Sequence, residues 1–359
     1  KRNDKLPVLP PREKIPPDAF WQADALLEGS ERVRQGHEIV AVSHCWLSAA
    51  HPDPSGEQLE KLARFLKAWN NHRTGLLLQR VAVYLDFCSE PQRRRLEEEK
   101  LHAQRARSFA DMWFAHDLTH VLQLTAVPRV GGEVPTPYQG RGWTTFEQAL
   151  PFINPTRKGT VLDVGRCETG ASYQERGWPS DVTAMNVLIQ HNTNSLDAHT
   201  MAGCIVPQRP PMAPKRFAAQ LETKKFSVRS DLEALTQQYE AAFQAITSSL
   251  PIRRLELSSL QWEDTQVDWL AESLPSFKFL EELNLSDNLI TDSGAGTLAE
   301  WISGCPSLQK IFLPGNEVEF GFMGAEELLE GWKAAGKDDF WLMLSYPEHS
   351  DFVRRKADL

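Results

Sequence analysis

The sequence predicts an α/β protein: a doubly wound parallel sheet with helices on both faces, followed by a smaller unit built from repeats. Two observations predict this. Short apolar, β-branched runs alternate with helical stretches over the first half of the chain, which is typical of parallel strands joined by crossover helices. Further along, the same apolar positions recur at a spacing of 28 residues.

The first half contains four strand-like runs with helical patterns between them. The runs read as near-continuous apolar segments, as expected for parallel strands buried on both faces. We expect strands at EIVAVS (38–43), RVAVYLD (80–86), THVLQLT (119–125) and TVLDV (160–164). We expect helices at 56–69, 93–115, 144–152 and 179–190.

Proline-rich stretches divide the chain into four parts. Residues 1–36 form an N-terminal arm that opens with LPVLPPREKIPP, and residues 37–204 form the α/β domain. Residues 205–229, which contain IVPQRPPMAPKRF, read as a proline-rich linker. Residues 230–359 form the repeat unit, which begins with a helix announced by the capping box Ser230–Glu233.

Composition excludes several classes of protein. The 359 residues are 41% hydrophobic and 24% charged, as in an ordinary globular protein. The net charge of −9 argues against nucleic acid as a partner, because phosphate binding needs a clustered positive field. No run of about 18 apolar residues occurs, so we expect no membrane span.

Five scattered cysteines lack the paired spacing of a zinc site and are odd in number. We therefore expect free thiols and a reducing compartment, such as the cytoplasm or the interior of an organelle. The residues His44, Cys45, Asp86 and Cys88 do not show the local spacing of metal ligands, so no metal site is predicted.

The 28-residue repeat has a defined pattern. Leucine or isoleucine recurs at three equivalent positions in each repeat, namely Ile252, Leu255, Leu257, Leu280, Leu283, Leu285, Leu308, Ile311 and Leu313. The segments 279–290 and 307–318 follow L-x-x-L-x-L-x-x-N, which resembles the leucine-rich repeat, with Asn288 and Asn316 at the asparagine position. We expect three repeats over about 252–322, capped by the 230–250 helix and by residues 323–359.

Reactive side chains follow three successive strands. The first predicted strand ends in Ser43-His44-Cys45-Trp46, the second continues into Asp86, and the loop after the third delivers Arg141, Trp143 and Glu147. Ligands of doubly wound sheets bind at the carboxyl ends of strands, where the strand order reverses. These side chains are therefore the candidate site.

The segments VAVSHCWL, VYLDFCSEPQ and YQGRGWTTFEQAL together resemble the TIR domain, in the divergent form common in algae and protists. The resemblance covers roughly residues 37–165 and implies a flavodoxin-like sheet. It also implies either homotypic contacts between TIR-like domains or cleavage of NAD at the nicotinamide–ribose bond. In such enzymes a glutamate four residues after a tryptophan is essential, and Trp143 and Glu147 have that spacing.

The resemblance makes Glu147 the candidate catalytic carboxylate and NAD a candidate substrate, with no other cofactor expected. Ser43, Asp86, Arg141 and Trp143 would line the pocket. A carboxylate can stabilise the positive charge that develops on ribose when a glycosidic bond breaks. The alternative is that Glu147 is an exposed residue in the first turn of a helix, where negative charge suits the helix dipole.

Two functions therefore remain. The first is a protein-interaction or scaffold protein, an accessory subunit of a larger assembly that contacts other subunits through its repeats and proline-rich arms. The length given to a linker and repeats favours it, as does the departure from the TIR pattern at Cys45 and Thr144. The second is an NAD glycohydrolase, which the Trp143–Glu147 spacing favours.

Overall fold

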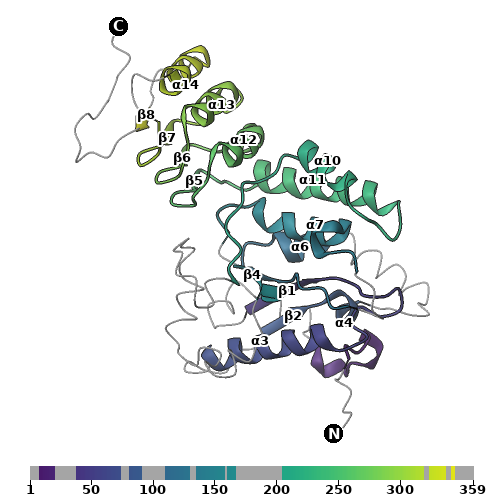
Figure 1. Cartoon of the computed structure of the whole chain (residues 1–359). Coiled ribbons are helices and arrows are strands. Elements are labelled where there is room, and N and C mark those ends of the chain that lie inside the picture. The colour runs from purple at the N-terminus through teal and green to yellow at the C-terminus, as the bar shows by residue number, and fades with distance from the viewer. Residues whose placement is uncertain are drawn as a thin grey trace.

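Two separate parallel sheets organise the protein. The computed structural model describes residues 8–20, 38–73, 81–90, 110–129, 135–157, 160–166, 204–318, 323–336 and 341–343. The first sheet has the strand order β2-β1-β3-β4 and the second has the order β5-β6-β7-β8. The chain is thus α/β, as predicted, with helices layered against both sheets (Figure 1).

All strand pairs of the first sheet are parallel. The strands are β1 (Glu38–His44), β2 (Val81–Tyr84), β3 (Thr119–Leu124) and β4 (Val161–Asp163). β2, β3 and β4 lie within runs predicted to be strands, and β1 extends one residue beyond its predicted run, 38–43. Because β1 lies between β2 and β3, the order of strands reverses around β1.

Helices cover both faces of this sheet. α3 (Glu57–Arg73) lies on one face, and α6 (Ala110–Ala115) and α7 (Gly142–Ala149) lie on the other (Figure 1). The helices expected at 56–69 and 144–152 are confirmed, the second ending in the 3-10 turn η5 (Leu150–Phe152). Of the helix expected at 93–115, the described part is α6, and the helix expected at 179–190 lies outside the described residues.

Alternating side chains give the sheet two cores. Val40 and Val42 of β1 pack with Leu62 and Phe65 of α3. Ala41, which points the other way, packs in the cluster that contains Phe146 of α7. Successive residues of a strand face opposite sides, so the alternation tells which residues of each strand meet α7.

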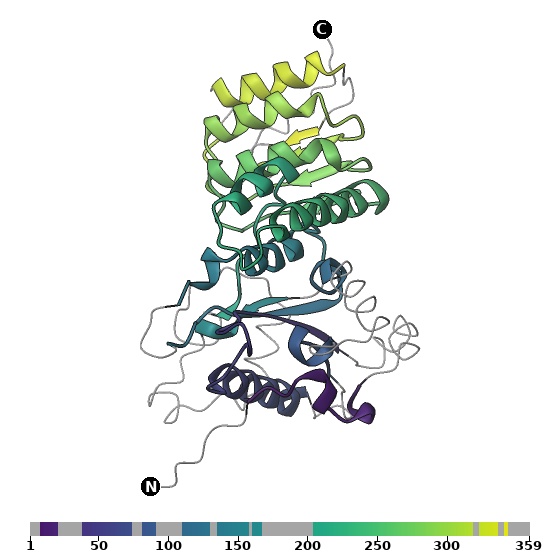
Figure 2. The same ribbon diagram turned by 90° about the vertical axis from the view of Figure 1, so that its right-hand side faces the viewer.

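A third layer of helices follows. α10 (Pro214–Glu222) and α11 (Asp231–Ser249) pack on α6 and α7 (Figure 2). The segment 205–229, expected to be a linker, thus contains a helix whose Phe217 and Leu221 are fully buried. Pro214 occupies its first turn, where the missing N–H is not needed.

The expected capping box at the start of α11 does not form. Ser230 has helical backbone angles and makes no side-chain capping bond. Asp231 instead accepts a hydrogen bond from the indole Nε1 of Trp143 at 2.8 Å. The first residue of α11 thus makes a tertiary contact, while the residue before it makes no side-chain capping bond.

Strands and helices alternate in the second sheet. The elements are β5 (Arg254–Glu256), α12 (Asp264–Ser273), β6 (Glu282–Asn284), α13 (Asp292–Ile302), β7 (Lys310–Phe312), α14 (Met323–Ala334) and β8 (Trp341–Met343). Arg254 pairs with Glu282 and Glu282 with Lys310, each 28 residues on. β8 adds a fourth parallel strand in the region expected to be a cap.

Asparagine side chains join consecutive repeats. The Oδ1 atom of Asn288 accepts from the backbone N–H of Leu260 and Trp262, at 3.0 and 3.1 Å. Its Nδ2 donates to the carbonyls of Leu257 and Leu285 at 2.9 Å. These bonds satisfy backbone groups that would otherwise be buried without partners. Asn316 bonds the next turn in the same way.

Residues 8–20 of the N-terminal arm, which include η1 (Arg12–Lys14) and η2 (Pro17–Ala19), pack on the α/β domain. Leu9 is buried in the core on the α3 face, and its carbonyl contacts Nε2 of His51 at 3.0 Å. Arg12 donates to the carbonyl of Ser89. This part of the arm therefore covers its own chain.

Cysteine chemistry differs from the expectation in one place. Cys204 is disulfide-bonded, whereas Cys45, Cys88 and Cys305 carry thiols. No helix within the described residues combines the length and apolar character needed to cross a membrane.

Each repeat has a residue in the left-handed region at the same place in its turn, and the first repeat has a second one, Gln261, with φ of 55°. Ser259, Asp287 and Gly315 stand at equivalent positions, 28 residues apart, with φ of 57°, 55° and 76°. Only the third is glycine, the residue that adopts this conformation without steric cost. A Cβ on Gly315 would lie 2.3 Å from Oδ1 of Asp287.

We expect Ser259→Gly to stabilise the protein by about 0.5–1 kcal/mol, because Ser259 is exposed and glycine removes the left-handed strain. Urea unfolding measures the change. Gly315→Ala is the matched control and should destabilise, since it adds both strain and a clash. Destabilisation by Ser259→Gly would show that the hydroxyl matters more than the backbone conformation.

Candidate functional site

A row of polar side chains crosses the carboxyl end of the first sheet. Ser43 of β1 pairs in register with Gln123 of β3, and Gln123 pairs with Asp163 of β4. Their exposed fractions are 0%, 1% and 4%. By strand alternation all three lie on the face covered by α7. Buried polar groups need partners, so this row needs contacts from the loop and helix above it.

Ser43 lies at the centre of those contacts. Its Oγ is 2.5 Å from the hydroxyl of Tyr138, in η4 (Tyr138–Gly140), and donates to Oε2 of Glu147 at 2.5 Å. Tyr138 is fully buried and Glu147 partly exposed. A hydrogen-bonded chain thus runs from a buried phenol through Ser43 to the carboxyl group of Glu147.

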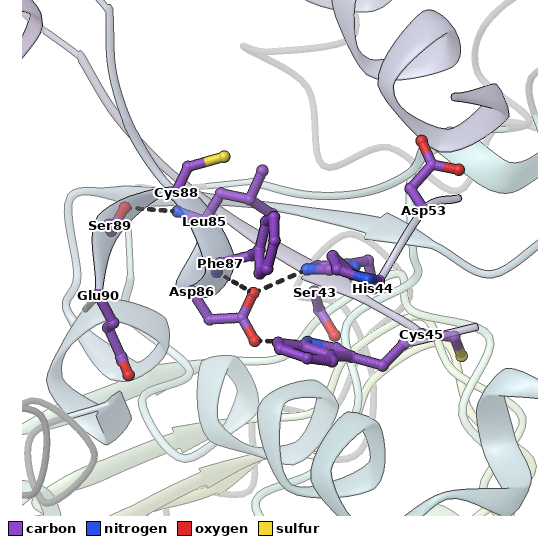
Figure 3. Close-up of polar contacts among 12 residues, drawn as sticks. Ser43, His44, Cys45, Asp53, Leu85, Asp86, Phe87, Cys88, Ser89 and Glu90 are labelled. Atoms are coloured by element: carbon purple, nitrogen blue, oxygen red, sulfur yellow. Dashed lines mark hydrogen bonds and ion pairs between the residues drawn. The ribbon is translucent and has the colours of Figure 1, made fainter. Parts of the chain in front are cut away.

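Asp86 forms a second group of contacts on the neighbouring strand end, at the start of α4 (Asp86–Ser89). Its Oδ1 lies 2.9 Å from Nε2 of His44, and its Oδ2 accepts from the indole of Trp46 at 2.8 Å. The backbone N–H of Phe87 also bonds Oδ1 (Figure 3). Burial raises the pKa of Asp86, but His44, Trp46 and this N–H outweigh burial and hold the pKa below its ordinary value.

The pKa of Glu147 shifts in the opposite direction. Burial raises it well above its ordinary range, the bond from Ser43 opposes this, and the charges of Asp86 and Glu90 add to the rise. Burial and Glu147 likewise raise the pKa of Tyr138. The pKa values of the two carboxyl groups, Asp86 and Glu147, are therefore shifted in opposite directions.

Arg141 and Trp143 flank the site through contacts with the rest of the chain. Arg141 donates to the carbonyls of Thr136 and Trp46, at 3.0 and 2.7 Å. The indole N–H of Trp143 points to Asp231 of α11. The structure thus brings Ser43 and Glu147 into contact, places Asp86 within charge-interaction range of Glu147, and joins Trp143 to the helix layer instead.

Gly142, at the start of α7, lets the ring of Phe226 come close to the backbone of this helix. Its N–H donates to the carbonyl of Lys225, and a Cβ there would lie 2.1 Å from the ring of Phe226. The glycine of the motif RGW therefore allows the segment after α10 to lie against this helix.

The free thiols beside the site are unreactive. Burial raises the pKa of Cys45 to about 11 and that of Cys88 to about 12. Thiolates are the nucleophilic form, so neither residue suits covalent catalysis at neutral pH. In the part of the chain that the structure describes, His, Cys, Asp and Glu do not gather in threes that could hold a metal ion.

Sequence reasoning missed Tyr138, Gln123 and Asp163. It placed Glu90 at this edge of the sheet without a role, and Glu90 accepts from the hydroxyl of Tyr84 at 2.8 Å. A signal existed for two of them: Gln123 and Asp163 are polar residues within otherwise apolar runs. A polar side chain inside a buried strand needs a partner from elsewhere in the fold.

A groove of about 600 Å³ lies elsewhere, between α10 and α11. Its walls include Glu222, Glu233 and Gln237 and none of the predicted site residues.

No protein-family model matches this sequence, and no curated protein is similar to it.

We expect the stability of the protein to depend on pH through the carboxyl group of Asp86. Because its folded pKa is depressed, the stability it contributes is present above the ordinary pKa of aspartate and is lost as pH falls through the folded pKa. Asp86→Asn keeps an acceptor for Trp46 but removes the charge facing His44. We expect it to cost about 1 kcal/mol at pH 7, a value reduced by the 37% exposure of this side chain.

Thermal unfolding from pH 7 to about pH 3 measures this effect. The wild-type protein should lose more stability on acidification than the variant. Glu240→Gln, on the exposed side of α11, serves as the control for loss of one carboxylate. Parallel profiles for wild type and Asp86→Asn would contradict the assignment.

Proposed function

We propose that the protein is a protein-interaction or scaffold protein, an accessory subunit of a larger assembly, built from a TIR-like α/β domain and a leucine-rich repeat unit. The strand order β2-β1-β3-β4, with helices on both faces, supports a flavodoxin-like domain of TIR type. The 28-residue strand register and the bonds of Asn288 and Asn316 support leucine-rich repeats.

One observation carries this proposal: the polar groups of the candidate site are engaged within the chain. Arg141 bonds two carbonyls, Trp143 bonds Asp231, and Asp86 bonds His44 and Trp46. The buried side chain of Tyr138 occupies the space beside Ser43. A catalytic centre directs such groups at its substrate instead.

The outward face of the repeat sheet is the proposed contact surface. Its charged residues largely pair across strands: Glu282 bonds both Arg254 and Lys310, which lowers the pKa of its carboxyl group. Phe312 and its register partner Met343 are partly exposed on this face and give it an apolar spot. Apolar contacts ringed by polar groups are typical of protein interfaces.

Phe312→Lys tests this surface. We expect the variant to lose the large complex that the wild-type chain forms in an extract of its source, and to migrate as the free 40.6 kDa chain. Size-exclusion chromatography with detection of the chain measures this. Glu300→Lys, on the exposed face of α13, is the control and should keep the complex. Equal migration of both variants with wild type would contradict a role for Phe312.

A second candidate function is cleavage of NAD at the nicotinamide–ribose bond. The observation in its favour is the place of Glu147: it is partly exposed at the point where strand order reverses, beside Ser43. In this function Glu147 would stabilise positive charge on the ribose, with Ser43, Asp86, Arg141 and Trp143 lining the site.

Nicotinamide release from NAD by the purified chain decides between the two. The interaction proposal expects no release, because Tyr138 fills the space beside Ser43, even at concentrations high enough to drive self-assembly. Release that disappears in Glu147→Gln would establish the enzyme and overturn the interaction proposal as the sole function.

A further inference from the structure

Residues 8–20 of the N-terminal arm form a small unit with contacts of its own. In η1 the backbone N–H of Ile15 donates to the carbonyl of Arg12 at 3.0 Å. In η2 the N–H of Phe20 donates to the carbonyl of Pro17 at 3.2 Å. The guanidinium of Arg12 also lies over the ring of Phe20, 4.8 Å from the ring centroid, and joins the two turns. Part of the shape of this segment is therefore internal to it.

Two prolines make the backbone of this segment extended. Pro11 has φ of −64° and ψ of 155°, and Pro16 has φ of −58° and ψ of 140°. These values are close to the angles of polyproline II. Because the proline ring fixes φ, such a segment loses little conformational entropy when it binds to a surface. The arm thus has the conformation that proline-rich peptide ligands use.

One side chain of the arm enters the core of the α/β domain. Leu9 is 4% exposed and lies in the same apolar core as Leu62 of α3 and Phe87 of α4. The other described residues of the arm, 8 and 10–20, are exposed or partly exposed. Leu9 is therefore the apolar anchor of the segment.

His51, in the loop after β1, holds the arm at the same point. Its Nδ1 accepts from the backbone N–H of Asp53 at 2.9 Å, so in the neutral ring the proton is on Nε2. Nε2 therefore donates to the carbonyl of Leu9 at 3.0 Å. The ring of His51 also packs against Phe87, with centroids 4.9 Å apart. The imidazole thus contacts both the anchor residue and the aromatic ring of α4.

α4 makes further hydrogen bonds to the arm, and η1 lies beside it (Figure 1). The thiol of Cys88 donates to the carbonyl of Pro10 at 3.2 Å. Nε of Arg12 donates to the carbonyl of Ser89 at 3.2 Å. Each of these bonds, like that of His51, has a backbone carbonyl as its acceptor.

We propose that the surface formed by His51, Phe87, Cys88 and Ser89, the arm-binding surface, also takes the arm of a second copy of this chain. Two copies then exchange arms, and each arm makes on its neighbour the contacts that it makes on its own chain. Exchange of an identical element is a low-cost route to a dimer, because the same contacts form again. This proposal does not depend on the repeat-sheet surface proposed above.

The single anchor and the length of the connection to β1 both support exchange. Leu9 alone among the described arm residues is buried, so release of the arm exposes little apolar surface. The segment 21–37 separates the described part of the arm from β1. A chain of that length spans at most about 55 Å, more than the roughly 30 Å width of a small domain. The arm can therefore reach the same surface on an adjacent copy.

This connection also sets the concentration at which exchange appears. An arm tied to its own chain has an effective concentration in the millimolar range near its own surface. The arm of another copy competes only as the chain concentration approaches that range. We therefore expect monomers in dilute solution, and exchanged arms where copies are concentrated or held together in an assembly.

Photo-crosslinking in the full chain tests the proposal. The photoreactive residue p-benzoylphenylalanine replaces Pro10, which is exposed and whose carbonyl meets Cys88. This chain is mixed with an equal amount of ¹⁵N-labelled wild-type chain, illuminated at about 10 μM and at about 1 mM, and digested for mass spectrometry. Links from the arm to residues 84–90 of the labelled chain report exchange. We expect their share of all links to residues 84–90 to rise more than about tenfold over this range.

Matched variants show whether the links come from the arm contacts. Leu9→Asp in the photoreactive chain should remove the links to residues 84–90 at both concentrations, because a charge replaces the apolar anchor. Arg12→Ala is a milder variant that keeps the leucine and should reduce them. The photoreactive residue at Leu250, which is exposed at the end of α11, is the control for random collisions and should give no such links. Phe312→Lys should leave exchange unchanged, which separates this result from the repeat-sheet proposal.

Three outcomes overturn the proposal. The first is that the links to residues 84–90 stay within unlabelled chains even at about 1 mM, which makes the arm a permanent cover of its own chain. The second is that Leu250 yields as many links to the labelled chain as position 10 does. The third is that links to residues 84–90 do not form at the lower concentration, because the arm then lies elsewhere.

Discussion

The packing of α11 between α7 and the first repeat is the contact on which the rest of the structure depends. Leu235, Tyr239 and Phe243 of α11 are buried in the same cluster as Phe146 of α7, and the ring of Tyr239 stacks on Phe217 of α10 with centroids 3.8 Å apart. At its other end, Ile246 packs in both this core and the core of the repeats. One helix therefore fixes the position of α7 and closes the end of the repeat stack.

The packing that fixes the position of α7 also determines where the side chains of the candidate site lie. Phe146 faces α10 and α11, and the next residue, Glu147, reaches Ser43 at the sheet. Trp143 bonds Asp231 and thereby sets the start of the helix against α11. Phe226 covers Gly142 at the same terminus. The site thus lies between the sheet and α7, which α10 and α11 hold from its other side. This arrangement keeps the geometry of the side chains constant.

Different surroundings shift the pKa values of two carboxyl groups at this site, those of Asp86 and Glu147, in opposite directions. Asp86 meets donors on both oxygens and favours its charged form. Burial raises the pKa of Glu147 well above its ordinary value, and the charges of Asp86 and Glu90 add to the rise against the opposing bond from Ser43. Such divergent pairs occur in catalytic sites and in structural networks of ionisable groups alike. Arg141 and Trp143 make their hydrogen bonds within the chain, as members of a structural network do.

Periodicity in the sequence determined the element types and much of the core. The apolar runs predicted the four strands of the first sheet, and the spacing of 28 residues predicted the register of β5, β6 and β7, because both signals are local and repeat. The places of Asn288 and Asn316 also followed from that spacing. The site residues Ser43, Asp86 and Glu147 could be chosen because parallel strands present their carboxyl ends at one edge of a sheet.

Only the tertiary structure decided what these residues contact. Nothing near Ser43 in the sequence indicates Tyr138 as its partner, because 95 residues separate them. The bond between Trp143 and Asp231 spans 88 residues, and the local cap expected at Ser230 does not form. Residues 205–229 read as a linker because prolines dominate the local pattern, yet burial of Phe217 and Leu221 outweighs it. Long-range packing, which a local pattern does not encode, decided each of these.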